Sequence, residues 1–159
     1  MIGRLAHLAR RFFGALRGRP LTPVEQAEAA GLLRPDERGL FWGQQPADQR
    51  HALESVRAVL GRAPGRRDLA RAALLHDVGK GLVGLGIVGR VLATGLSLLH
   101  LPVGGRFAAY LGHAKSGADH LAAAGAEALV VAYARHHHEA RPPAVPAEAW
   151  EALTAADRS

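Results

Sequence analysis

The chain has 159 residues, which is enough for one domain with its own hydrophobic core. It contains no cysteine, which excludes disulfides and thiolate metal sites, so a bound metal must be held by His, Asp or Glu. The net charge is +6, but the arginines beyond the N-terminus are scattered and not interleaved with aromatic residues, so we predict a solvated basic surface and no specific nucleic-acid partner.

Residues 2–17 have the pattern of a basic amphipathic helix, and we treat residues 1–20 as a segment separate from the domain at 21–159. Apolar residues recur on one arc of this helix and basic residues on the other. Arginines interrupt every apolar run, which is unlike a secretory signal. We favour a helix docked on the domain, and binding to an anionic membrane surface is the alternative. We therefore expect a cytoplasmic protein, peripheral to the membrane if the alternative holds.

The rest of the chain predicts helices and no strands. Thr22-Pro23-Val24-Glu25 has the form of a capping box and begins a helix that runs to Leu33. No segment alternates apolar and polar residues as a half-buried strand does, so the fold class is all-α. Further helices are expected from near Pro46 to Leu60, from Asp68 to Asp77, and near 106–112, 116–124, 127–137 and 147–157.

Residues 82–101 are the most apolar part of the chain. Eleven of these twenty residues are Leu, Ile or Val, but four glycines, Arg90 and His100 interrupt them. On insertion scales the aliphatic gain of roughly 3–7 kcal/mol is about cancelled by these interruptions. We therefore expect buried helices of a soluble domain here in preference to a membrane-spanning helix.

His76 and Asp77 form the most informative pair of residues. Burying both costs free energy unless each finds a partner, and a divalent cation is a suitable partner for an imidazole and a carboxylate. Helical spacing places His76 on the same face as Leu69 and two small alanines, so it points inward. Asp77 lies about 100° further around the helix, so both side chains can reach one site.

Other histidines and an aspartate have the spacing to join them. His51 lies on a helix face of small residues, and the run His136-His137-His138 ends an apolar helix, where at most two of the three can reach one site. Asp157 follows the core-facing residues of the last predicted helix and is delivered inward. The competing interpretation is an exposed helix end for the histidine run and a frayed terminus for Asp157.

This ordered series resembles the HD superfamily of metal-dependent phosphohydrolases in its HDIG form, over about residues 48–157. The residues from His76 to Lys80 are similar to its His-Asp-Ile/Val-Gly-Lys signature, and His113-Ala114-Lys115-Ser116-Gly117-Ala118 is similar to its His-x-x-x-Gly-Ala segment. His137-His138-Glu139 resembles its paired-histidine segment. The resemblance implies an all-helical bundle around a central metal site.

The resemblance also implies roles for individual residues. His51, His76, Asp77 and Asp157 would hold one divalent metal ion, and Asp77 would bridge to a second ion held by His113, His137 and His138. Lys80 would neutralise a phosphate oxygen and Glu139 would orient a ligand or a water molecule. The ions would be one or two of Mn, Fe, Zn, Ni, Co or Mg, because a site of histidines and carboxylates suits all of them.

The implied activity is hydrolysis of a phosphomonoester or phosphodiester, on a nucleotide-like small molecule, by metal-activated hydroxide. The alternatives are a domain that keeps the metal and senses a nucleotide without turnover, and a protein attached to the membrane surface through the N-terminal helix and residues 82–101. Ala140-Arg141-Pro142-Pro143-Ala144 stands where cyclic-di-GMP phosphodiesterases of the superfamily carry a Gly-Tyr-Pro motif, so that substrate is not expected. Ala47 stands where trinuclear members carry Glu, so a third metal is not expected. The sequence gives no oligomeric state.

Overall fold

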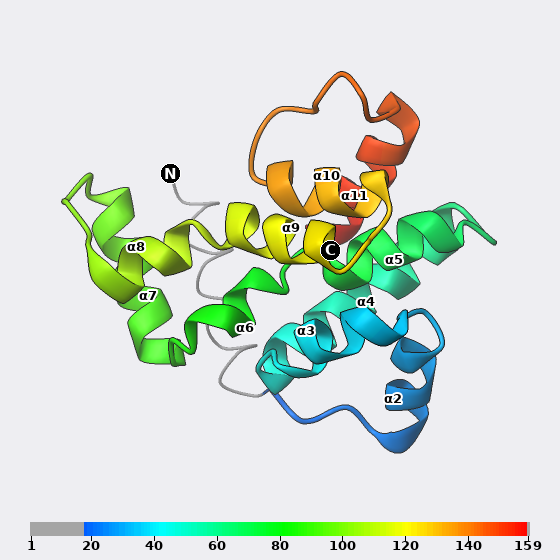
Figure 1. Ribbon diagram of the computed structural model, residues 1–159, viewed down its shortest axis with the longest axis horizontal. Coiled ribbons are helices and arrows are strands. Elements are labelled where there is room, and N and C mark those ends of the chain that lie inside the picture. Colours follow the sequence, from blue (N-terminus) through cyan, green and yellow to red (C-terminus); the bar gives the residue numbers. More distant parts are fainter. Residues whose placement is uncertain (1–17, 159) are drawn as a thin grey trace.

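A computed structural model describes residues 18–158, and that part of the chain consists of helices and connecting loops (Figure 1). The all-α prediction is confirmed. The predicted helix at 2–17 lies outside the described residues. The elements are α2 (Pro23–Ala30), the 3₁₀ helix η1 (Pro35–Glu37), α3 (Arg38–Trp42), α4 (Pro46–Arg62), α5 (Arg67–Leu75), α6 (Gly79–Val83), α7 (Ile87–Leu98), α8 (Gly105–Leu111), α9 (His113–Ala123), α10 (Ala128–His136) and α11 (Ala147–Asp157).

Helix α5 is the centre of the fold. Every residue from 69 to 75 is buried, and the helix packs against α4, α10 and α11. Its one buried charge, Arg71, donates to the carboxylates of Glu37 and Glu127, which compensates the cost of removing the guanidinium from water. This apolar centre fixes the position of the residues that follow it, from His76 onward.

The helix boundaries follow local signals that the sequence contains. Thr22 accepts a hydrogen bond from the Glu25 backbone while the Glu25 side chain accepts from the Thr22 backbone, so the predicted capping box forms. A proline occupies the first position of both α2 and α4. The helices η1 and α3 were not expected from the sequence, because they are too short to show a helical period; the fully buried Phe41 holds them in place.

The expectation that residues 82–101 form buried helices is wrong for most of α7. Ala93 is buried, but large apolar side chains on the same helix are exposed, among them Val88, Leu92 and Leu98. The high content of Leu, Ile and Val predicted burial, yet α7 packs chiefly on α8, which is itself peripheral to the core.

No single helix among residues 18–158 is long and apolar enough to cross a membrane. One bent pair, formed by residues 67–83 and 88–98 with an angle of 98° between them, has sufficient length and apolar composition to do so.

Candidate metal centre

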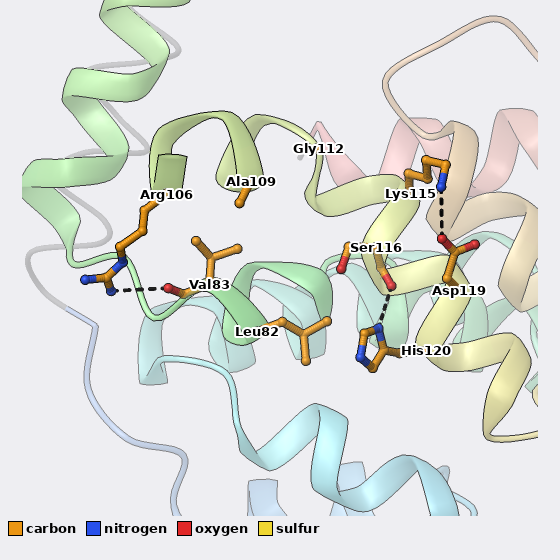
Figure 2. Close-up of a pocket in the computed structure, with 9 residues that line it drawn as sticks. All are labelled: Leu82, Val83, Arg106, Ala109, Gly112, Lys115, Ser116, Asp119 and His120. Carbon is orange, nitrogen blue, oxygen red and sulfur yellow. Dashed lines mark hydrogen bonds and ion pairs between the residues drawn. The ribbon is translucent and has the colours of Figure 1, made fainter. Parts of the chain in front are cut away.

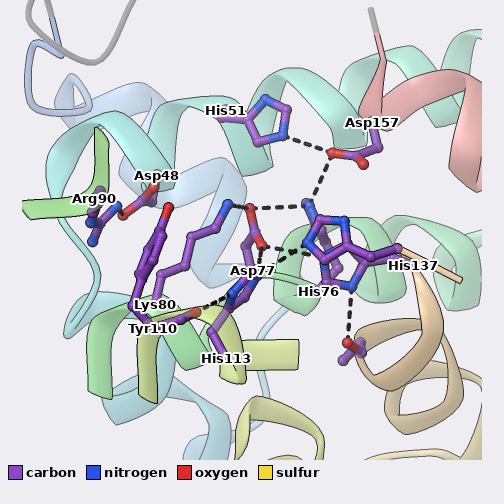
Figure 3. A network of polar contacts seen from close by, with 12 residues as sticks. Asp48, His51, His76, Asp77, Lys80, Arg90, Tyr110, His113, His137 and Asp157 are labelled. Atoms are coloured by element: carbon purple, nitrogen blue, oxygen red, sulfur yellow. Dashed lines mark hydrogen bonds and ion pairs between the residues drawn. The ribbon is translucent and has the colours of Figure 1, made fainter. Parts of the chain in front are cut away.

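Five helices deliver the predicted ligands to one place (Figure 3). Two of the ligands, His76 and Asp77, lie in the turn between α5 and α6. The others lie on α4 or at an end of α9, α10 or α11, so residues as far apart as His51 and Asp157 are in contact. The structure thus brings together all seven predicted ligands: His51, His76, Asp77, His113, His137, His138 and Asp157.

Four of these residues form a first cluster. Asp157 Oδ1 lies 3.0 Å from His51 Nε2 and 3.2 Å from His76 Nε2. His76 Nε2 also lies 3.4 Å from Asp77 Oδ2. Ligand atoms of His51, His76 and Asp77 lie within 4.8 Å of one another, which is close enough for them to hold one metal ion.

A second cluster lies on the other side of Asp77. Asp77 Oδ1 is 3.2 Å from His113 Nε2 and 3.4 Å from His137 Nε2, and His138 Nε2 is 3.3 Å from His113 Nε2. These four residues also offer ligand atoms within 4.8 Å of one another. Because Oδ1 faces this cluster and Oδ2 faces the first, Asp77 has the geometry of a bridging carboxylate.

The backbone fixes which ring nitrogen of three histidines faces the centre. His76 Nδ1 lies 2.8 Å from the Ala73 carbonyl, and His113 and His137 repeat this contact with the carbonyl three residues before each of them, at 2.7 and 2.9 Å. A carbonyl only accepts, so Nδ1 carries the proton and donates it. In the neutral imidazole this leaves the lone pair on Nε2, which points into the cluster, as is usual for metal-binding histidines.

The centre fits a divalent cation. The Nε2 atoms of His76 and His137 are buried and make no hydrogen bond, although carboxylate oxygens lie 3.2–3.4 Å from them. Buried ring nitrogens normally have a partner, so such atoms require an explanation. Neutral imidazoles and carboxylates in this arrangement are ligands for Mn, Fe, Zn, Ni or Co.

The charges at the centre are strongly perturbed. Burial favours the protonated carboxyl, but Lys80 and His76 hold the pKa of Asp77 well below its usual range. Burial lowers the pKa of His76, but Asp77 and Asp157 overcome this effect and raise it to about 10. Without metal His76 is therefore protonated at neutral pH, and metal binding must release that proton.

Two histidines of the second cluster, His137 and His138, are neutral by contrast. Burial lowers the pKa of His137. His138 lies at the exposed edge of the cluster, yet its pKa is lowered to about 3. The main cause is partial burial of its ring, and the neighbouring His137 and His113 add to the effect. Both rings are thus neutral at pH 7 and ready to ligate.

Two predicted residues occupy places that the sequence did not indicate. Lys80 was expected either at a phosphate or exposed beyond a helix end, but it is buried and its ammonium contacts Asp77 Oδ2. Glu139 was expected to orient a ligand or a water, but it is exposed and its carboxylate lies 2.8 Å from Nδ1 of His136, which is outside the cluster. Of the three consecutive histidines, only His137 and His138 reach the site, as expected.

Aromatic residues around the ligands were missed by the sequence analysis. The Tyr133 ring lies 5.8 Å from His76 and 6.0 Å from His137, and its buried hydroxyl makes no hydrogen bond. Tyr110 stacks on His113 with 5.6 Å between ring centroids. Tyr133 precedes His137 by four residues, so helical spacing was the signal that could have found it.

A groove of about 660 Å³ lies on the outer side of α6, α8 and α9 (Figure 2). Apolar residues such as Leu82 and Val83 and polar residues such as Lys115 and His120 line it. None of the seven clustered residues does, so this groove is separate from the candidate metal centre.

Comparison with protein families finds the HD domain over residues 50–158, a range that contains all seven clustered residues. The chain belongs to the HD domain family. Comparison with curated proteins and with solved structures finds no match. Membership of this HD family indicates a function of the metal-dependent phosphohydrolase type.

Proposed function

We propose that this HD domain hydrolyses a phosphomonoester or phosphodiester of a nucleotide-like small molecule, with one or two divalent ions as cofactor. The observation that carries the proposal is the position of Asp77 between two clusters of ligands, with one carboxylate oxygen facing each. That arrangement is typical of centres that hold two ions a few ångströms apart. Bound divalent ions supply a Lewis acid for the phosphoryl oxygens and lower the pKa of water.

The residues of the chain have distinct parts in this proposal. His51, His76 and Asp157 hold one side of the centre, and His113, His137 and His138 hold the other. Lys80 places a buried ammonium beside Asp77, where it adds positive charge for a phosphate oxygen. The side chains of His51, Asp157 and His138 are the ones in this set that solvent reaches. Substrate therefore enters the centre past these three residues.

The test uses full-length protein without a polyhistidine tag, loaded separately with Mn, Fe, Zn, Ni, Co and Mg. Each form is assayed on phosphomonoesters, phosphodiesters and nucleotides. We expect turnover with at least one metal, and a loss of at least ~100-fold in His137→Ala because a ligand is removed. His136→Ala is the matched control, because His136 is the next residue in the chain but its ring lies outside the cluster.

Each result separates the proposal from its rival. Turnover that persists in His137→Ala or that falls equally in His136→Ala contradicts the assignment of the site. Stoichiometric metal and tight nucleotide binding without turnover on any ester contradict the enzyme and favour a sensing domain.

A further inference from the structure

Helix α7 presents an apolar stripe to solvent. Val88, Val91 and Leu92 follow the spacing of one helix face, and Leu99 continues it just beyond the helix end. Val88 and Leu99 are each 71% exposed and Leu92 is 52% exposed. Scattered exposed leucines are ordinary on a protein surface, but a contiguous stripe of them indicates an interaction surface.

The α7–α8 hairpin is set apart from the hydrophobic core. Figure 1 shows α7 and α8 at one end of the molecule, away from α4 and α5. Among the residues of the two helices whose burial the structure describes, none belongs to the core cluster. Arg90 anchors the hairpin, because its guanidinium donates to Asp48 on α4 at 2.6 Å. The apolar stripe therefore lies on a hairpin that projects from the domain and is fixed to it through Arg90.

The length of α7 excludes a membrane-spanning role and suits an interfacial one. Its twelve residues extend about 18 Å, against a hydrocarbon thickness of about 30 Å. The other half of the bent pair cannot supply the missing length, since α5 is buried in the core and leads into His76 and Asp77. An apolar helix of this length that is not buried in protein is typical of an interfacial segment.

The charge around the hairpin identifies the surface that it fits. Residues 78–118 contain no Asp or Glu, whereas they contain four basic residues. Two of these, Arg106 and Lys115, are exposed on α8 and α9. Arg106 donates to the backbone carbonyl of Val83, and Lys115 is paired with Asp119, just beyond this range. An apolar helix face on a segment that carries basic but no acidic residues of its own complements anionic lipid headgroups above an acyl layer.

We propose that α7 and the loop 99–101 insert into the interface of an anionic lipid bilayer and hold the HD domain at the membrane surface. The apolar stripe enters the boundary between headgroups and acyl chains, and Arg106 on α8 lies against the lipid phosphates. The proposal does not depend on the catalytic activity, and its test is independent of turnover.

The test exploits the absence of cysteine from the chain. Leu98→Cys in the full-length protein carries one environment-sensitive fluorophore on the exposed side of α7, and Val24→Cys, at a position 78% exposed on α2, is the control. We expect a blue shift at position 98 with phosphatidylglycerol-containing vesicles, and no shift with pure phosphatidylcholine or at position 24. An unchanged spectrum at position 98, or an equal shift at both positions, overturns the proposal. A shift that follows protein concentration without lipid also overturns it and indicates that two copies of the chain pair through α7.

A second variant tests the same face without a label. Leu92→Asp/Leu99→Asp removes two apolar side chains from the stripe, and we expect vesicle co-sedimentation to fall roughly tenfold or more. Val24→Asp is expected to co-sediment with vesicles to the same extent as the wild-type protein. An unchanged helical circular-dichroism spectrum and thermal unfolding midpoint show that the double variant has kept its fold. A folded double variant that still co-sediments fully contradicts the insertion of α7.

Discussion

Asp77 is the residue on which the chemistry of this protein depends. Its two oxygens face different groups of histidines, and it is buried with Lys80 as its nearest cation. A buried carboxylate stays ionised only if its surroundings are strongly positive, and Lys80 and His76 hold the pKa of Asp77 well below its usual range. Bound divalent ions would supply positive charge to the same carboxylate. The ions and Lys80 would therefore act on Asp77 together in any metal-bound state.

Lys80→Met separates metal binding from turnover. The change removes a cation but no metal ligand. We therefore expect the metal content to equal that of the wild-type protein while kcat/KM falls at least ~10-fold. Without metal the variant leaves a buried carboxylate with less compensation, which costs roughly 3–5 kcal/mol of unfolding free energy. Steady-state kinetics, metal analysis and denaturant unfolding give the three quantities.

The matched control is the only other lysine of the chain. Lys115 is exposed on α9, so Lys115→Met is expected to leave kinetics and metal content unchanged. Turnover at the unchanged rate in Lys80→Met would show that its ammonium serves folding alone.

At the scale of elements, the contact between α6 and α9 places the second cluster. A Cβ atom built on Gly79 would lie 2.0 Å from the carbonyl oxygen of His113 and 2.8 Å from the amide nitrogen of Gly117. Two backbones can approach this closely only if both residues are glycine. His113 is thereby held with its Nε2 atom 3.2 Å from Asp77, so this glycine pair positions a ligand through backbone contact alone.

Gly79→Ala tests that contact. The methyl group meets backbone atoms that cannot rotate away, so α6 and α9 must separate, and we expect a loss of about 1–3 kcal/mol or more in stability. His113 moves with α9, so metal affinity falls as well. Thermal unfolding and metal titration measure the two effects.

Gly61→Ala on α4 is the control for the effect of glycine on the helical backbone. Its Cβ would meet nothing within 4 Å, so alanine is expected to stabilise the protein by about 0.5–1 kcal/mol. Equal effects of the two substitutions would contradict the account of the α6–α9 contact.

The capping box of α2 also connects that helix to α4. Arg50 on α4 donates to both Glu25 oxygens, at 3.0 and 3.2 Å, and with Thr22 it lowers the pKa of Glu25 to about 2. A lowered folded pKa means that the stabilisation is complete above the unfolded value of 4.5. It is lost as the pH falls toward about 2.

Glu25→Gln is therefore expected to lower the unfolding free energy at pH 7, with the difference from the unchanged protein shrinking between pH 4.5 and 2. Urea unfolding across this range measures it. Glu54→Gln, at an exposed position of α4, is the matched control for the substitution itself. A difference that is the same at pH 3 and pH 7 would contradict the role of the Glu25 charge.

At the scale of the whole molecule, the metal centre closes the fold. Its ligands come from helices at both ends of the domain sequence, so a bound ion would connect α4, α9, α10 and α11 through the turn after α5. An ion that binds only the folded chain at a hundred times its Kd stabilises it by about 2.7 kcal/mol. We therefore expect Tm to rise by roughly 5–10 °C on metal loading and to return with a chelator. A Tm that is insensitive to metal, or that shifts equally in His137→Ala, contradicts this.

Much of this arrangement could be predicted from the sequence because its signals are local. The helical spacing of His76 among small residues predicts that its side chain points inward. The four residues from Thr22 to Glu25 are enough to predict the capping box. The clustering of His51 with Asp157 was expected only from the order of motifs, since no local pattern connects residues so far apart.

Other features depend on tertiary contacts that the sequence does not display. Lys80 is buried because Asp77 attracts its ammonium, although its position just past a helix end also fits an exposed lysine. The hydrophobicity of residues 82–101 indicates burial, and only the placement of α7 away from the core shows that this stripe faces solvent. Apolar periodicity predicts an apolar face but not what covers it.

The most direct test of the central claim is the metal content of folded, tag-free protein and of Asp77→Ala by elemental analysis. The account predicts between one and two equivalents of a divalent transition ion in the unchanged protein, and a marked loss in the variant because both clusters share Asp77. Absence of a stoichiometric ion after loading, or full retention in Asp77→Ala, would contradict it.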